Sequence, residues 1–368
     1  MKSSGQIGEN TVRGIVLGVI FGTALLVGIE KLANFYEETL TPISTTPGAS
    51  VDPHPFLLWE LPPGETLVNG QSIQVNSVGA RGPEVAPAKE DNARRILFLG
   101  DNVAFGEGVE RDDTFGMNCL DSLGGGRVGI EGVLMAVPDY TVIQHRNLMN
   151  MRGWDLKPDL LVVTGPGVEM SVTRYVDEDV ISNFRSTDPT RARLEEFALF
   201  RVLDQSLRIK HGQTATRRQQ VFKSGVHANQ AGMPRVGTNV FASTLDLLAT
   251  EAIERDVEVI FVILPLPADL DDSHFTNRVK LYRAAMLSVA DRLGIPVVDG
   301  PSVFKNSVRS AEQLFMGPRV LTEYGHRILG YALSKKLRPW MRGRRLIGQG
   351  TGGALPVLAE PEPLGGDQ

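Results

Sequence analysis

Five short runs of largely apolar residues lie in the middle of the chain, and their apolar residues follow one another instead of alternating with polar ones. The runs span residues 95–100, 132–137, 159–164, 257–265 and 296–299. A strand that is apolar at successive positions is covered on both faces, which is typical of a parallel sheet. The runs therefore predict five strands of a mainly parallel sheet.

Between these runs, apolar residues recur at intervals of three and four, which is the period of one helix face. The two clearest sets are Val279, Tyr282, Met286, Val289 and Leu293, and Phe241, Leu245, Leu248 and Ala252. Strands that alternate with helices predict an α/β fold, here a three-layer doubly wound sandwich with a mainly parallel five-stranded sheet. Ligands of such folds bind beyond the carboxyl ends of the strands, where the Asp101–Asn102 turn would lie.

The N-terminal segment has a different pattern, because Gly14–Ile29 contains no charged residue. With Arg13 and Lys31 able to reach the interface on either side, this run predicts one transmembrane helix over residues 14–36. A cleaved signal peptide is the alternative, but no small-x-small site follows the run. Basic residues before the helix place residues 1–13 in the cytoplasm, so the chain would cross a cell inner membrane once and carry its globular part in the periplasm.

Glycine recurs at every fourth position inside this helix, at Gly14, Gly18 and Gly22. That spacing places three positions without side chains on one face, where another helix could approach closely. Glycine is also simply common in membrane helices. The pattern favours helix–helix packing in the membrane.

Three segments have compositions unlike the rest. Residues 37–64 are Pro-rich and predict an extended tether, in which the stretch HPFLLWELPPG runs along the surface of the globular domain without forming an element. Within that domain (65–345), residues 170–238 are polar and without strand signals, which predicts an insertion with one or two helices. Residues 346–368 are rich in Gly and Pro and predict a disordered tail.

Composition and motifs exclude several classes of function. The net charge of −5 gives no general reason to expect nucleic acid as a partner, and Cys119 is the single cysteine, so no intrachain disulfide can form. An exported domain of this length can bury enough core without one. The histidines show no metal-ligand spacing, and no nucleotide-binding loop follows the first strand. We therefore expect no metal and no cofactor.

Five sequence blocks, in order, carry a resemblance to a known family. They are VNSVGARG (75–82), RRILFLGD…FGEGV…DTF (94–115), VPDYTVIQ (137–144), PDLLVVTGPGVE (158–169) and LTEYGHRIL (321–329). Together they resemble the membrane-anchored bacterial branch of the SGNH (GDSL-like) hydrolases. The resemblance implies an α/β fold outside the cytoplasm and, in the family, hydrolysis of acyl esters.

The residues that carry the family's chemistry do not match. The position of the nucleophilic serine is Asn102, the glycine that donates a backbone N–H to the oxyanion is Ala136, and the oxyanion-binding asparagine is Val168. The Asp and His of the last block fall at Gly317 and Val320. His326 remains, but in the family the corresponding histidine starts the final helix and is not the base.

Acyl transfer needs a nucleophile, a base and donors aimed at the oxyanion, and these replacements supply none of them from side chains. A relict cleft remains, with Asp101, Asn102, Asp139 and Glu169 as its polar residues. A displaced acid–base pair of Asp101 with Glu169 is the alternative. We expect instead that Asp101 binds backbone N–H groups of the turn and that Glu169 is solvated.

The sequence thus predicts a catalytically inactive membrane-anchored protein that acts as a structural subunit of a membrane protein complex. Its partners would be other membrane-protein subunits, through the helix and the extracytoplasmic domain, and the lipid bilayer. A second hypothesis is a binding module whose relict cleft, near Asn102, Asp139 and Val320, holds a glycan or an acyl chain. A third is a membrane-anchored esterase that removes O-acyl groups from cell-envelope polymers.

Overall fold

The computed structural model divides into two units, and each is described by itself. One unit comprises Met1–Ile43 with Asp179–Gly225, and the other, the α/β unit, comprises Ser44–Glu178 with Val226–Gln368. The structure describes residues 4–40, 51–54, 56–89, 93–124, 129–173, 177, 197, 199–200, 203, 233–271, 277–343 and 346.

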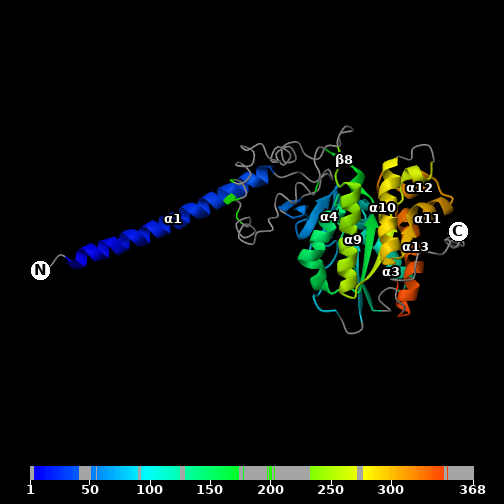
Figure 1. Ribbon diagram of the computed structural model, residues 1–368, viewed down its shortest axis with the longest axis horizontal. Coiled ribbons are helices and arrows are strands. Elements are labelled where there is room, and N and C mark those ends of the chain that lie inside the picture. Colours follow the sequence, from blue (N-terminus) through cyan, green and yellow to red (C-terminus); the bar gives the residue numbers. More distant parts are fainter. Residues whose placement is uncertain are drawn as a thin grey trace. The chain divides into compact units, whose positions relative to one another are not determined.

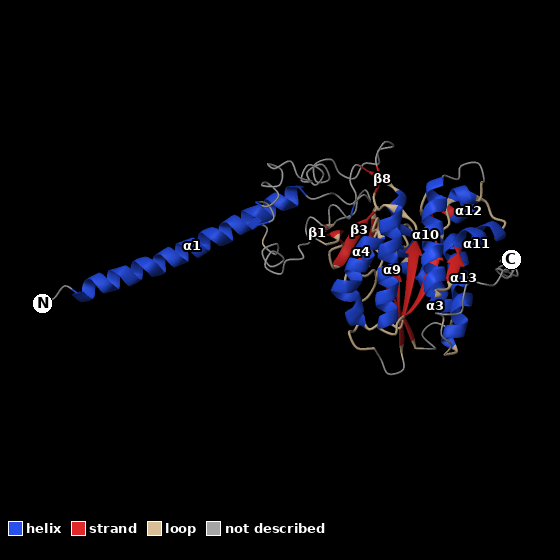
Figure 2. Ribbon diagram, in the orientation of Figure 1, coloured by secondary structure: helices blue, strands red, loops and turns tan. Residues whose placement is uncertain are grey.

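The core of the α/β unit is a sheet of five parallel strands in the order β11-β10-β7-β5-β6. Figure 2 shows these strands in red, between helices. Their bounds are β5 (Arg94–Leu99), β6 (Ile130–Leu134), β7 (Leu160–Gly165), β10 (Glu258–Ile263) and β11 (Val297–Asp299). β7 and β10 are buried at every position, because helices cover both faces. The prediction of five strands in an α/β fold is confirmed.

Helices pack into two groups around this sheet. The first comprises α4 (Val142–Leu148), α9 (Thr238–Glu254) and α10 (Asn277–Leu293), which contact one another in that order (Figure 1). The second comprises α3 (Phe115–Ser122), α11 (Gly300–Asn306) and α13 (Glu323–Met341). The predicted faces of α9 and α10 are confirmed, since Phe241 and Leu245 on α9 and Tyr282 and Met286 on α10 are buried.

Short elements connect these helices and strands. Hairpins are formed by β3 (Gly64–Val68) with β4 (Gln71–Val75) and by β12 (Phe315–Gly317) with β13 (Val320–Leu321). The short helices are α2 (Asn102–Phe105), η1 (Arg111–Asp113), η3 (Met149–Gly153), η4 (Trp154–Leu156), η5 (Val168–Met170), η6 (Pro267–Asp269) and α12 (Ala311–Leu314).

The stretch from His54 to Gly64, expected to form no element, contains strand β2 (Leu58–Glu60) and the end of strand β1 (Asp52–His54). β1 pairs with β2, and the side chains of Leu57 and Trp59 are fully buried. Side chains of α4 hold this stretch, because Gln144 Nε2 donates to the Leu57 carbonyl oxygen at 2.6 Å. The tether prediction was wrong here, because burying these large apolar side chains outweighs the preference of the surrounding prolines for extended chain.

The insertion at residues 170–238 contains a strand pair that its composition did not predict. β8 (Val172–Thr173) pairs antiparallel with β9 (Met233–Pro234) where the insertion leaves and rejoins the α/β unit. The predicted helices of the insertion fall largely outside the described residues. The tail at 346–368 also lies outside them, except for Leu346, which is buried and whose N–H donates to Glu258 at 3.1 Å.

The N-terminal segment forms one helix, α1 (Ser4–Leu40), which extends beyond both ends of the predicted 14–36. No proline interrupts it, so the helix continues past the apolar run on both sides. Its span of 21 residues from Arg13 to Ala33 is long and apolar enough to cross a membrane, and residues 13–28 of this span are exposed. The positions of Gly14, Gly18 and Gly22 have open space around them.

Candidate functional site

The turn that follows β5 is held by the carboxylate of Asp101. Its Oδ1 accepts the N–H of Val103 at 3.4 Å, which caps α2, and its Oδ2 accepts the N–H of Val168 at 3.2 Å. The backbone comes so close that a Cβ at Gly167 would lie 1.9 Å from Asp101 Oδ2. As expected, Asp101 binds backbone N–H groups and joins the end of β5 to the loop after β7.

The amide of Asn102 has hydrogen-bond partners at both ends. Its Oδ1 accepts the N–H of Asp139 at 3.0 Å, and its Nδ2 donates to the carboxylate of Glu107. Asn69, in the turn between β3 and β4, donates to the other oxygen of Glu107. Burial raises the pKa of Glu107, although its hydrogen bond from Asn102 opposes this rise. Asn102 thus links three parts of the chain at the position where the resemblance places a nucleophile.

Glu169 is buried, so the expectation that it is solvated was wrong. Its Oε1 accepts the N–H of Val142 at 3.0 Å, and its Oε2 accepts the N–H of Gly167 at 2.8 Å. These bonds satisfy the first turn of α4 and the loop after β7, which is why a carboxylate is tolerated here. Burial raises the pKa of Glu169, and the backbone hydrogen bonds lower it.

The environment of Asp101 also perturbs its proton affinity. Burial and the neighbouring charge of Glu169 raise the pKa of Asp101 to about 7, Asp139 adds to the rise, and Arg319 opposes it. Both carboxyl groups are buried and accept N–H groups of the loop after β7, so ionising both of them costs free energy. The arrangement resembles an acid–base pair electrostatically, but each carboxylate already accepts backbone N–H groups.

The remaining positions of the family's machinery carry no acid or base. Ala136 and Val168 are buried, and the N–H of Val168 donates to Asp101. Gly317 and Val320 face each other across the β12–β13 hairpin. Because β13 contacts α2, the structure brings the hairpin beside the helix that starts at Asn102. The structure therefore brings Gly317 and Val320 close to the turn at Asn102.

His326 has a structural role at the start of α13. Its Nδ1 accepts the N–H of Phe115 at 3.1 Å, and the two rings are stacked. Burial lowers its pKa to about 3, so the imidazole is neutral at neutral pH. No group of three or more His, Cys, Asp or Glu among the described residues is arranged to hold a metal ion.

A buried ion pair supports the turn at Asp139, and sequence reasoning did not find it. Arg235 donates to the Asp139 carbonyl oxygen and to Asp177 Oδ2, each at 2.8 Å, and its guanidinium lies 5.5 Å from the centre of the Trp59 ring. The side chains of Arg235 and Asp177 are 1% and 0% exposed. Both residues belong to the polar insertion. Because many residues there are charged, the sequence does not indicate which of them are buried.

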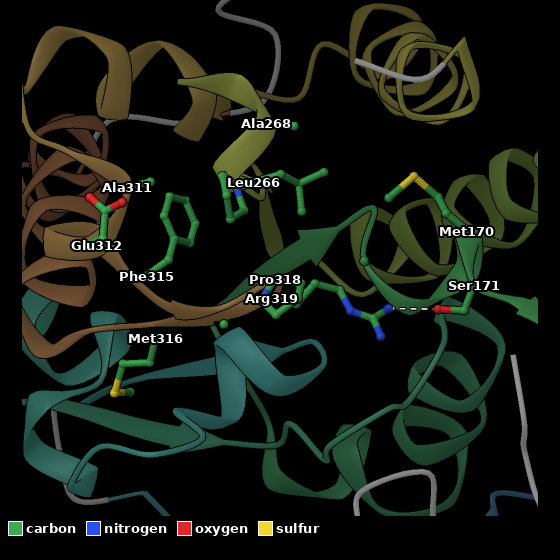
Figure 3. A pocket seen from close by; sticks show the side chains of 13 residues that line it. Met170, Ser171, Leu266, Ala268, Ala311, Glu312, Phe315, Met316, Pro318 and Arg319 are labelled. Carbon is green, nitrogen blue, oxygen red and sulfur yellow. Dashed lines mark hydrogen bonds between the residues drawn. The ribbon is translucent and has the colours of Figure 1, made fainter. Parts of the chain in front are cut away.

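A cleft of about 730 Å³ lies between the loop after β7 and the β12–β13 hairpin (Figure 3). Three segments of the chain, around η5, η6 and from α12 to the β12–β13 turn, line the cleft. The lining residues are Gly167, Met170, Ser171, Leu266, Pro267, Ala268, Ala311, Glu312, Phe315, Met316, Gly317, Pro318 and Arg319. The three positions expected around a concave site, Asn102, Asp139 and Val320, do not line this cleft, although Gly317 does. Asn102 and the backbone of Asp139 instead bond to each other.

Comparisons with known proteins give matches of structure alone. No family model matches the chain, and no curated protein matches it. The structure is similar to that of Axe2, an acetylxylan esterase from Geobacillus stearothermophilus, with 12% identity and a TM-score of 0.43 over 71% of this chain and 100% of that one. LAE5, an alpha/beta hydrolase from the metagenome of Lake Arreo in Spain, shares 14% identity with a TM-score of 0.43 over 68% and 96% of the two chains.

A third similar structure is assigned to the lipolytic G-D-S-L family and comes from Desulfitobacterium hafniense DCB-2. It shares 14% identity with a TM-score of 0.40, over 66% of this chain and 98% of that one. These likenesses concern the fold. The α/β architecture itself follows from the order and direction of the five strands.

Proposed function

We propose that the chain is a catalytically inactive, SGNH-hydrolase-like protein that acts as a structural subunit of a membrane protein complex. The observation that carries the proposal is the bonding of Asn102. Its amide is held at both ends, by the Asp139 N–H and by Glu107, at the position of the nucleophile. An amide so placed connects segments of the chain and cannot attack an ester.

The neighbouring acids do not replace the missing chemistry. A general base must accept a proton from the attacking group, which requires a free lone pair within hydrogen-bond reach of the substrate. Asp101 and Glu169 use their oxygens to hold backbone N–H groups of the loop after β7 and of α4. Their bonding supports a structural role for both.

Helix α1 supports a role in the membrane. Its apolar span from Arg13 to Ala33 fits an anchor, and the absence of a small-x-small site after the span favours an uncleaved helix over a signal peptide. Gly14, Gly18 and Gly22 would let a helix of another subunit approach. With the basic residues at its N-terminal side, the anchor would hold the α/β unit on the extracytoplasmic side of the inner membrane.

Purification from native membranes tests this proposal. The full chain carries a C-terminal tag, is extracted in mild detergent, and its co-purifying proteins are quantified by mass. Partners in fixed stoichiometry are expected, and Gly18→Leu should reduce their yield. Val27→Leu, on the opposite face of α1 by the helical period, is the matched control and should leave the yield unchanged. A lone monomer would contradict the proposal.

An esterase that removes O-acyl groups from cell-envelope polymers is the activity that the family resemblance implies. Turnover of an aryl acetate by the unaltered chain would favour this alternative over the structural role. A non-catalytic binding module is the second alternative, and the cleft beside the turn favours it. The two roles are compatible, because a subunit can also hold a ligand.

A further inference from the structure

The cleft combines apolar walls with a single cation. Leu266, Phe315 and Met316 supply apolar surface, and Arg319 is the one Lys or Arg among the residues that line the cleft. Figure 3 shows the Arg319 guanidinium directed toward Ser171, away from Glu312. The cleft volume of about 730 Å³ lies within the usual range for pockets that bind small molecules.

Arg319 is half-buried, and its hydrogen bond goes to a neutral group. Its Nη1 donates to Ser171 Oγ at 2.8 Å. Within the described part of the chain, no carboxylate forms an ion pair with this guanidinium. A guanidinium presents a planar fork of donors that matches a carboxylate, so its remaining N–H groups can bind an anion that enters the cleft.

We propose that this cleft binds a small amphipathic carboxylate, with its anionic end on Arg319 and Ser171 and its apolar end against Leu266 and Phe315. The exposed carboxylate of Glu312, at the other end of the cleft, disfavours the reverse orientation. A sugar would require more polar groups than these walls offer. The proposal concerns a ligand and goes beyond the subunit role, which does not require it.

Binding at Arg319 is linked to protonation of Asp101. Arg319 lowers the pKa of Asp101, which burial, Glu169 and Asp139 together raise to about 7. A bound carboxylate partly neutralises Arg319 and removes this stabilisation of the Asp101 anion. Near neutral pH the complex therefore takes up part of a proton, and the affinity falls as the pH rises above about 7. Arg319 also lowers the pKa of Glu107, so this carboxyl group contributes in the same direction.

Calorimetric titration of 3-phenylpropionate into the full chain in lipid nanodiscs tests the proposal, with empty nanodiscs as the blank. The neutral 3-phenylpropionamide is the matched ligand, and it should bind about tenfold or more weakly because it lacks the charge-assisted bond. Arg319→Gln should weaken the binding of 3-phenylpropionate to a similar degree. Arg327→Gln, an exposed arginine on α13, should leave binding unchanged. Near pH 7, the binding enthalpy of 3-phenylpropionate should depend on the ionisation enthalpy of the buffer, because protons are taken up on binding.

Three results would overturn the inference. The first is equal binding of the carboxylate and the amide by the unaltered chain, a comparison that needs no variant to fold. The second is unchanged affinity in Arg319→Gln, and the third is no saturable binding of 3-phenylpropionate in the millimolar range. None of these outcomes bears on the subunit role, which the membrane purification tests separately.

Discussion

The turn after β5 and the cleft beside β12 are neighbours in one α/β unit, and their polar groups are used in opposite ways. Asp101 and Asn102 in the turn, and Glu169 in the loop packed against it, are each hydrogen-bonded to other parts of the chain. In the cleft, the Arg319 guanidinium borders open space and bonds a neutral hydroxyl. The polar groups of the first region hold the fold together, whereas the guanidinium of the second can still accept a ligand.

The difference lies in what the polar groups of the two regions bind. The amide of Asn102 has two partners, and Asp101 and Glu169 accept backbone N–H groups that would otherwise be buried without a hydrogen bond. The side chains of the turn should therefore contribute more to the free energy of unfolding than those of the cleft. The three tryptophans, Trp59, Trp154 and Trp340, all belong to the α/β unit and report its unfolding.

The largest expected effect comes from the ion pair that supports the turn at Asp139. Asp177→Ala leaves Arg235 buried without its anion and should lower the free energy of unfolding by about 3–5 kcal/mol. Asp246→Ala, which breaks the exposed pair with Arg292, is the control and should cost less than about 1 kcal/mol. Urea unfolding of the full chain in detergent, followed by tryptophan fluorescence, measures both. Equal small losses would show that the ion pair does not stabilise the turn.

Asn102 should give the next largest effect. Asn102→Ala removes the acceptor of the Asp139 N–H and the donor to Glu107, and should lower the free energy of unfolding by about 1–3 kcal/mol. The exposed Asn306→Ala is the control and should stay within about 0.5 kcal/mol of the unaltered chain.

The same position also tests the proposed lack of catalysis. Asn102→Ser restores a hydroxyl but no base, since Gly317 and Val320 cannot accept a proton. We expect no turnover of an aryl acetate above that of the unaltered chain. Turnover that appears with the serine would show that another residue acts as the base and would contradict the structural role of the turn.

How far the sequence predicts these two regions depends on the kind of interaction. Continuous apolarity identifies β7 and β10, because a buried strand needs apolar side chains on both faces. The burial of Glu169 was missed. The sequence around a glutamate does not indicate whether its carboxylate is solvated or is buried and hydrogen-bonded to backbone N–H groups. The burial of Trp59 was also missed. Prolines surround its apolar stretch and suggest extended chain, whereas its burial depends on contacts with α4, which is distant in the sequence.

The insertion shows the same limit more sharply. Asp177 and Arg235 are far apart in the chain and lie among other charged residues, yet they form an ion pair with almost no exposed surface. Local composition predicts solvated side chains there, whereas the pairing of β8 with β9 and the hydrogen bond from the Asp177 N–H to the Arg235 carbonyl oxygen bring the two together. Contacts between distant segments thus decide the candidate site, whereas local pattern was enough for the sheet.

A smaller effect is expected in the pH dependence of stability. Because the folded pKa of Asp101 is raised to about 7, above the value of 3.8 for a free side chain, the folded chain binds this proton more tightly than the unfolded chain. The contribution is therefore full below about pH 4 and is lost as the pH rises through about 7. Asp101→Asn keeps an oxygen acceptor for only one of the Val103 and Val168 N–H groups, so it should lower the free energy of unfolding at every pH, and it should flatten this fall by about one proton.

Urea unfolding at several pH values between these limits measures the slope. Glu169 also has a raised pKa and contributes in the same direction, so a residual slope should remain in Asp101→Asn. Asp121→Asn, an exposed acid on α3, is the control and should leave the slope unchanged. An identical slope in Asp101→Asn and in the unaltered chain would show that Asp101 is ionised in both states, and the proton uptake expected on ligand binding would lose its source.

The smallest effect should come from the cleft itself. Met316 lines the cleft and its side chain is 52% exposed, so Met316→Ala removes little buried surface and should change the free energy of unfolding by less than about 0.5 kcal/mol. The same urea experiment used for Asn102→Ala measures it. A loss as large as that of Asn102→Ala would mean that the cleft wall is part of the framework too. The contrast between a closed turn and an open cleft would then fail, because both regions would stabilise the fold to the same extent.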